Sequence, residues 1–187
     1  MTASTMMITL ITPARVMPRL SARDADHVVD ELTGIVANDA ALSHERVRAA
    51  VLERGRASCF GFGRGVAIPH AEIPGLAHPI GAFARLRPAH DFGAVDEIRA
   101  DLAFLLLSPD GDDPTHLRAL ACVARRLRDR EVAARLRSAK DVEAIYVVLT
   151  SDAWREPGEE PENGHSATPH LRGLTNGSRY TSLRAPC

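Results

Sequence analysis

Three side chains, far apart along the chain, have chemistry that suits nucleophilic attack or contact with an anion: Arg54, His70 and His116. Neutral imidazole is a nucleophile that titrates near neutral pH. The arginine guanidinium is a planar fork of donors that suits bidentate contact with phosphate. Taken singly, each residue has an ordinary alternative, namely a surface histidine, a polar residue in a first helical turn, or a cation on a solvated helix face. Only their combination makes a candidate site.

The residues just before His70 predict its place in the fold. Pro69 has no N–H and restricts the residue before it to extended geometry, so we expect a strand to end there. His70 would then stand at a strand-to-loop junction, where functional side chains concentrate.

His116 and Arg54 are predicted to lie at helix ends. Asp113 and Pro114 form a good N-cap and first-turn pair, which places His116 in the first turn of a helix. Unpaired N–H groups and the positive end of the helix dipole lie there, so imidazolium is disfavoured and a nearby anion is favoured. Arg54 falls near the end of a helix that we expect to start at Ser43.

A glycine cluster, Gly61-Phe62-Gly63-Arg64-Gly65, also precedes His70. Such clusters let backbone N–H groups approach an anion. The dinucleotide fingerprint, however, needs GxGxxG between a strand and a helix. Here the third glycine comes one residue early, and a strand-like segment ending in proline follows. The sequence therefore favours glycines that shape a tight turn, and a dinucleotide-binding enzyme is poorly supported.

Apolar residues at helical spacing predict five helices. Ser21 to Asp24 has capping-box spacing with Asp in place of Glu, and so predicts the start of the first. The apolar positions of the successive helices are Val28, Val29, Leu32, Ile35 and Val36; Val47, Ala50 and Val51; Leu117, Leu120, Ala121, Ala124 and Leu127; Val132 and Leu136; and Val142, Ile145, Tyr146 and Leu149.

Four segments read as strands: Val16–Leu20, Val66–Ile68, Ile80–Leu86 and Leu102–Leu107. The last is apolar at every position, which is typical of an interior strand covered on both faces. Strands interleaved with helices predict an α/β sandwich.

Composition fits one globular domain with spare length. The chain has 187 residues, and its stretch from Ser151 to Cys187 holds four prolines and four glycines but no Ile, Val or Phe. Such a stretch buries too little apolar area to offset its ordering entropy, so we predict a flexible tail over residues 151–187.

Charge, apolar stretches and cysteine content argue against nucleic-acid binding, membrane insertion and secretion. A formal net charge of −1 lacks the basic field that non-specific nucleic-acid binding uses. The apolar stretches are far shorter than the ~20 residues of a membrane helix, so we expect no membrane insertion. No basic residue precedes the apolar stretch at the N-terminus, so we expect no secretory signal. Cys59, Cys122 and Cys187 form an odd set without metal-ligand spacing, which fits the cytoplasm.

The run GRASCFGFGRGVAIPHAEI resembles the active-site segment of the IIA (EIIA) domains of the bacterial phosphoenolpyruvate-dependent phosphotransferase system, of the fructose/mannitol and nitrogen-regulatory type. The resemblance spans residues 8–150. It includes an arginine sixteen residues before the histidine (Arg54 and His70), the later segment HDFGAVDEIRADLAFLLLSP, and THLRAL with His116. The segment GRGVAIPH, with the pattern GxGVAIPH, favours the nitrogen-regulatory branch.

The resemblance implies a mixed β-sheet between α-helices, and a role for each candidate. His70 matches the histidine that accepts a phosphoryl group from the phosphocarrier HPr or an HPr-like relative. His116 matches a second histidine that orients the phosphorylated one, and Arg54 matches an arginine that balances phosphoryl charge. The scheme requires no metal or cofactor. Sugar-transporting members pass the group to a cysteine of an EIIB domain, whereas nitrogen-type members regulate target proteins through their phosphorylation state.

Two positions depart from the family pattern. Phe60 stands ten positions before His70, where a hydroxyl residue is common, and Glu72 stands two after it, where polar or basic residues are more usual. A missing hydrogen-bond donor and an added carboxylate both act against phosphate. They motivate the alternative that the fold is kept as a binding module that senses an anion or a partner without transferring phosphate.

Overall fold

The computed structural model describes residues 3–111 and 114–152. The predicted tail lies outside them except for its first two residues, and so does Asp113. In chain order the elements are α1 (Ala3–Leu10), a 3-10 turn (Pro13–Arg15), β1 (Val16–Leu20), α2 (Ala25–Asp39), α3 (His44–Ala57), β2 (Gly61–Gly63), β3 (Val66–Ala67), β4 (His70–Ile73), β5 (Ile80–His90), β6 (Ala100–Pro109), α4 (Thr115–Arg128), α5 (Arg130–Ser138) and α6 (Val142–Thr150).

The six strands form one mixed sheet in the order β1-β5-β6-β3-β2, and β4 pairs with β6 beyond the end of β3. β1 runs parallel to β5, and both β3 and β4 run parallel to β6, whereas β5 and β6 are antiparallel. Every residue from Leu102 to Leu107 in β6 is fully buried. This confirms the prediction of an interior strand covered on both faces.

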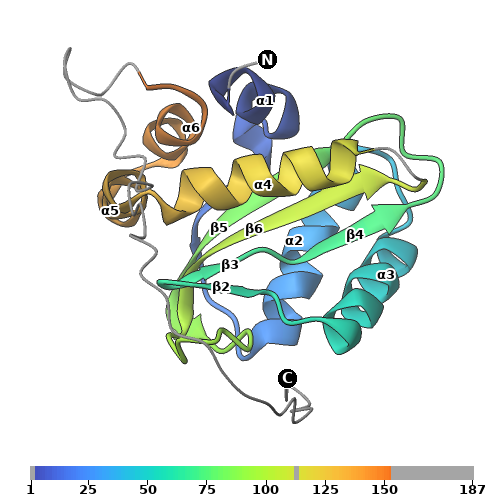
Figure 1. Ribbon diagram of the computed structural model, residues 1–187, viewed down its shortest axis with the longest axis horizontal. Coiled ribbons are helices and arrows are strands. Elements are labelled where there is room, and N and C mark those ends of the chain that lie inside the picture. Colours follow the sequence, from blue (N-terminus) through green and yellow to red (C-terminus); the bar gives the residue numbers. More distant parts are fainter. Residues whose placement is uncertain (1–2, 112–113, 153–187) are drawn as a thin grey trace, which may run out of the picture.

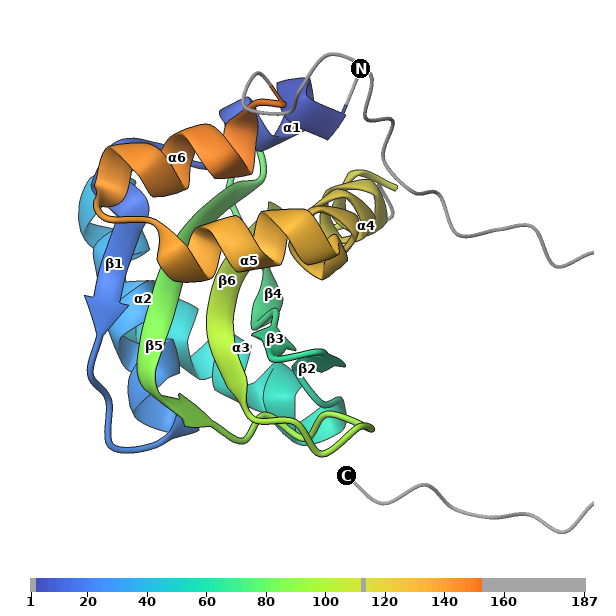
Figure 2. The same cartoon turned by 90° about the vertical axis from the view of Figure 1, so that its left-hand side faces the viewer.

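Helices cover both faces of the sheet, as the sequence predicted (Figures 1 and 2). α2 and α3 pack on one face, where their apolar residues join the alternate side chains Ala103, Leu105 and Leu107 of β6. α1, α4, α5 and α6 pack on the other face, around Leu102, Phe104 and Leu106. The period-two alternation of a strand thus divides the core into two clusters. None of the helices in the described residues is long and apolar enough to cross a membrane.

The starts of α2 and α3 follow from their capping residues. The Ser43 hydroxyl accepts a hydrogen bond from the Arg46 N–H, which confirms the predicted start of α3. The prediction for α2 was wrong by three residues, because Asp24 rather than Ser21 is the N-cap. The Asp24 carboxylate accepts from the His27 N–H and so satisfies one of the unpaired donors of the first turn.

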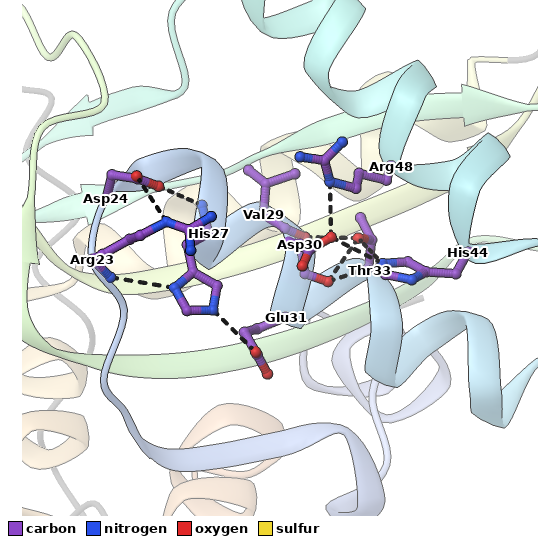
Figure 3. Close-up of polar contacts among 9 residues, drawn as sticks. All are labelled: Arg23, Asp24, His27, Val29, Asp30, Glu31, Thr33, His44 and Arg48. Atoms are coloured by element: carbon purple, nitrogen blue, oxygen red, sulfur yellow. Dashed lines mark hydrogen bonds and ion pairs between the residues drawn. The ribbon is translucent and has the colours of Figure 1, made fainter.

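A polar cluster fixes α3 against α2 (Figure 3). Asp30 of α2 forms an ion pair with Arg48 of α3 at 2.8 Å, and the His44 ring lies 3.1 Å from the Asp30 carbonyl and 3.2 Å from the Thr33 hydroxyl. Arg54 is on the same helix, so these contacts help to set its position.

The predicted apolar stripe of α4 was right in part: Leu127 is buried and Leu120 and Ala124 pack against the core, but its other two members do not. The buried side chains are Ala119, Val123, Arg126 and Leu127. Leu117, predicted to face the core, is 68% exposed, and Ala121 is exposed as well. The buried face is rotated because α4 begins beside a cavity at the end of β6, and its first turn faces that cavity instead of the core.

Candidate active site

One cavity brings together all three candidate residues. It has a volume of about 790 Å³ and lies between the last turns of α3, the strand β4 and the first turns of α4. His70, Arg54 and His116 line it, together with Glu53, Glu72, Leu117 and Leu120. The three candidates, of which Arg54 and His116 are 62 positions apart along the chain, therefore meet at one site.

His70 opens a strand and does not follow one into a loop, which corrects the expected junction. The pairing with β6 is interrupted before Pro69, because β3 ends at Ala67. A second strand, β4, then resumes at His70 and pairs with the same partner, β6, with His70 opposite Leu106. The break at Pro69 thus divides the segment that pairs with β6 into two short parallel strands, and the histidine lies directly after the break.

The break fixes the His70 ring. Its Nδ1 lies 2.8 Å from the Ile68 carbonyl oxygen, which can only accept, so Nδ1 carries the proton. The neutral ring then has its lone pair on Nε2. Burial is the main cause that lowers the pKa of His70, the charges of His116 and Arg54 act in the same direction, and the bond to Ile68 opposes them. The ring is therefore neutral and nucleophilic at neutral pH.

His116 lies beside it, in the first turn of α4, as the sequence predicted. The two ring centroids are 5.5 Å apart and the rings are tilted by 40°. Nδ1 of His116 is 3.0 Å from the hydroxyl of Ser108, at the end of β6. Burial lowers the pKa of His116 and Arg54 adds to this, whereas the Glu72 carboxylate opposes both.

Arg54 supplies the positive charge of the cavity. It lies in the last turn of α3, and its side chain is exposed. Its charge contributes to the lowered pKa of both His70 and His116. A guanidinium in this place would stabilise an anion bound between the two rings.

The two departures from the family pattern both touch the site. The Phe60 ring packs edge-on against His70, with centroids 5.5 Å apart and an interplanar angle of 63°. Phe60 is 7% exposed, so its ring keeps water from one side of the imidazole. Glu72 lines the cavity itself and acts on His116 rather than on His70.

The glycine cluster forms a turn, in line with the simpler of its two interpretations. β2 and β3 pair antiparallel around it, and Gly63, Arg64 and Gly65 all have positive φ, at 82°, 57° and 77°. This conformation favours glycine. Asp96 accepts a hydrogen bond from the Arg64 N–H at 2.7 Å, so the turn is tied to the loop before β6.

Two contributors to the site escaped the sequence reasoning. The Ile68 carbonyl carries no side-chain signal. Ser108 does have one, because it is a fully buried polar residue that directly follows six apolar positions in β6. Among the described residues, no group of three or more His, Cys, Asp or Glu side chains could hold a metal ion.

Comparison with known proteins identifies the arrangement. The model of the family "phosphoenolpyruvate-dependent sugar phosphotransferase system, EIIA 2" matches residues 9–152. The chain belongs to this family. The EIIA membership confirms the resemblance drawn from the sequence, and with it the mixed sheet between helices.

Relatives place this EIIA domain near the nitrogen-regulatory members. A nitrogen regulatory protein of Bradyrhizobium diazoefficiens is 39% identical over 140 residues, which cover 75% of this chain and 92% of the relative. The crystal structure of nitrogen regulatory protein IIA-Ntr from Neisseria meningitidis superposes with a TM-score of 0.71 at 25% identity, over 76% of this chain and 97% of that one. The mannitol-specific enzyme IIA of Escherichia coli, solved in complex with its phosphorylated enzyme IIB, shares the fold, with a TM-score of 0.63 at 15% identity over 74% of this chain and 96% of that one.

Proposed function

We propose that this EIIA domain carries a phosphoryl group on Nε2 of His70. The observation that supports this most directly is the bond from Nδ1 of His70 to the Ile68 carbonyl, which leaves Nε2 as the lone-pair nitrogen. His116 and Arg54 line the same cavity and are suited to stabilising charge on the phosphoryl oxygens. Membership of a phosphotransferase family supplies the reaction class.

The transfer is a displacement at phosphorus in which charge and protons balance. The Nε2 lone pair of His70 attacks the phosphorus of a phosphohistidine donor. A new N–P bond forms as the donor's P–N bond breaks, and the donor ring keeps that electron pair. His70 retains its Nδ1 proton, so the phosphorylated ring carries positive charge that the Ile68 carbonyl stabilises. Catalysis by such a site consists mainly of positioning and charge stabilisation.

The donor in this proposal is an HPr-like phosphocarrier, and the output is nitrogen-type regulation of a target protein in the cytoplasm. The names and identities of the relatives support the branch. The exposed Leu117 beside the partly buried Leu120 gives the mouth of the cavity an apolar rim suited to protein contact. Passing the group to an EIIB cysteine remains the sugar-type alternative for the next step.

The test is phosphorylation in a reconstituted chain. The protein is incubated with phosphoenolpyruvate, enzyme I and HPr from a matched source, and intact mass spectrometry reports the increment of one phosphoryl group. We expect an acid-labile increment on the wild type and none on His70→Gln. The matched control is His90→Gln, which removes a buried histidine outside the cavity and should keep the increment. An increment that persists in His70→Gln would refute the assignment.

A non-transferring binding module is the competing function, favoured by the Phe60 ring against His70 and by Glu72 in the cavity. It predicts that the wild type stays unmodified with matched, active donors while it still binds inorganic phosphate or the unphosphorylated HPr. Calorimetric titration with both would identify that outcome.

A further inference from the structure

Ser108 is the one polar residue in the otherwise apolar part of β6 that runs from Leu102 to Ser108. Its side chain is fully buried, and its hydroxyl lies 3.0 Å from Nδ1 of His116. A buried hydroxyl without a partner destabilises a fold, so its orientation is determined by the groups around it. Among the described residues, the ring of His116 is the partner of this hydroxyl.

The direction of this hydrogen bond decides which nitrogen of His116 carries the proton. A hydroxyl that accepts from Nδ1–H would leave its own proton buried without an acceptor. A hydroxyl that donates to Nδ1 uses its proton, and the neutral ring then carries its proton on Nε2. The second arrangement leaves no buried donor unsatisfied, so it is favoured.

The chemistry of the cavity favours the same arrangement. Nδ1 of His116 is directed at Ser108, so Nε2 is the nitrogen left for the cavity. Phosphoryl oxygens only accept hydrogen bonds, and Nε2 of His70 already presents a lone pair. A second lone pair on His116 would repel the phosphoryl group, whereas an Nε2–H group would bind it.

We propose that Ser108 is a positioning residue: its hydroxyl donates to Nδ1 of His116 and thereby holds the second histidine as an Nε2–H donor toward the group on His70. The two imidazoles are thus set in opposite tautomers by two neighbouring acceptor and donor groups. Ile68 places the proton of His70 on Nδ1, and Ser108 places the proton of His116 on Nε2. One ring is prepared to attack phosphorus and the other to hold its oxygens. The role in transfer rests on the proposed function, whereas the tautomer itself does not.

The first experiment measures the tautomers without any phosphoryl donor. Long-range ¹H–¹⁵N spectra of the histidine rings distinguish the protonated nitrogen from the lone-pair nitrogen in the unphosphorylated protein, at a pH where both rings are neutral. We expect Nε2–H for His116 and Nδ1–H for His70. In Ser108→Ala the His116 signals should move toward the other tautomer while His70 is unchanged. Nδ1–H on His116 of the wild type, or unchanged His116 signals in Ser108→Ala, would overturn the proposal.

The second experiment measures transfer. Ser108→Ala should slow phosphorylation from HPr about tenfold, by analogy with the partners that orient metal-binding histidines. Ser108→Thr, which keeps the hydroxyl, should restore most of the rate. In a His116→Ala background, Ser108→Ala should have no further effect. An equal loss in that background would show that Ser108 acts through the fold and not through His116.

A matched control separates the hydroxyl's role from the general loss of a buried polar group. Thr150 is also buried, and its hydroxyl donates to the Tyr146 carbonyl within α6, away from the cavity. Thr150→Val should leave the ring spectra and the transfer rate unchanged. A protein that accepts no phosphoryl group at all, yet shows the expected tautomers, would refute the proposed function and leave the role of Ser108 intact.

Discussion

Replacing Phe60 with threonine should restore the family's hydroxyl and at the same time raise the pKa of His70. Phe60 is 7% exposed and its ring packs against the imidazole. Burial is the main cause of the lowered pKa of His70, so removing the ring admits water and shifts the pKa back toward its ordinary value.

The same substitution has a cost in stability that can be worked from the burial. A phenylalanine buries about 200 Å², which at ~25 cal/mol per Å² corresponds to roughly 5 kcal/mol. Threonine retains a minor part of that area, so we expect a loss of about 3 kcal/mol, within the range for large-to-small core changes. For a domain of this size, that loss lowers Tm by roughly 6–12 °C.

The assay combines urea unfolding with an NMR pH titration of the His70 ring. Phe92→Thr is the matched control, because Phe92 belongs to the same core cluster and is equally buried. It should lose comparable stability and leave the pKa of His70 in place. If Phe60→Thr loses stability while the pKa of His70 stays as low as in the wild type, the ring does not desolvate the imidazole and the reasoning fails.

Three further predictions concern the charges of the cavity. Arg54→Gln should raise the pKa of both His70 and His116, because it removes a positive charge that opposes their protonation. The same variant should slow phosphorylation. Arg54→Lys, titrated in parallel by NMR, should keep both pKa values low. Glu72→Gln should lower the pKa of His116 further and leave that of His70 unaffected, and equal shifts at both rings would contradict the structure. Folding lowers the pKa of His70 from 6.5, so the unfolded chain binds the proton more readily than the folded one. The free energy of unfolding should therefore fall as the pH drops from 6.5 toward the lowered pKa. Urea unfolding of His70→Gln across that pH window should show a weaker fall than the wild type.

The elements of the fold were predictable where one physical cause dominates. Apolar runs and caps located β6 and the start of α3, because a fully buried strand and a serine N-cap leave local signatures. β2 was missed because its three residues include two glycines and show no apolar pattern, and β4 was missed because Pro69 was expected to end the strand before His70. The buried face of α4 was misjudged because Leu117, an apolar residue, lines the cavity mouth instead of the core.

The meeting of three candidate residues in one cavity was predictable from their types and from the family pattern, but the groups that orient them were not. His70, His116 and Arg54 do line one cavity. The contact that orients His70 comes from a backbone carbonyl, whose availability depends on how the chain turns at Pro69. The contact that orients His116 comes from Ser108, which depends on the register between a strand and a helix eight residues later. Neither relationship is a property of residue type.

The interruption of the sheet at Pro69 has a consequence for how such a domain can diversify. The carbonyl that leaves Nε2 of His70 as the lone-pair nitrogen lies two residues away along the same backbone, so this selection needs no help from distant elements. In the proposed phosphocarrier, substitutions at rim residues such as Leu117 or Glu72 would change which proteins dock, while Nε2 of His70 would remain the nitrogen that reacts. Under the proposed function, partner choice and bond-making chemistry are in this way separable properties of one small pocket.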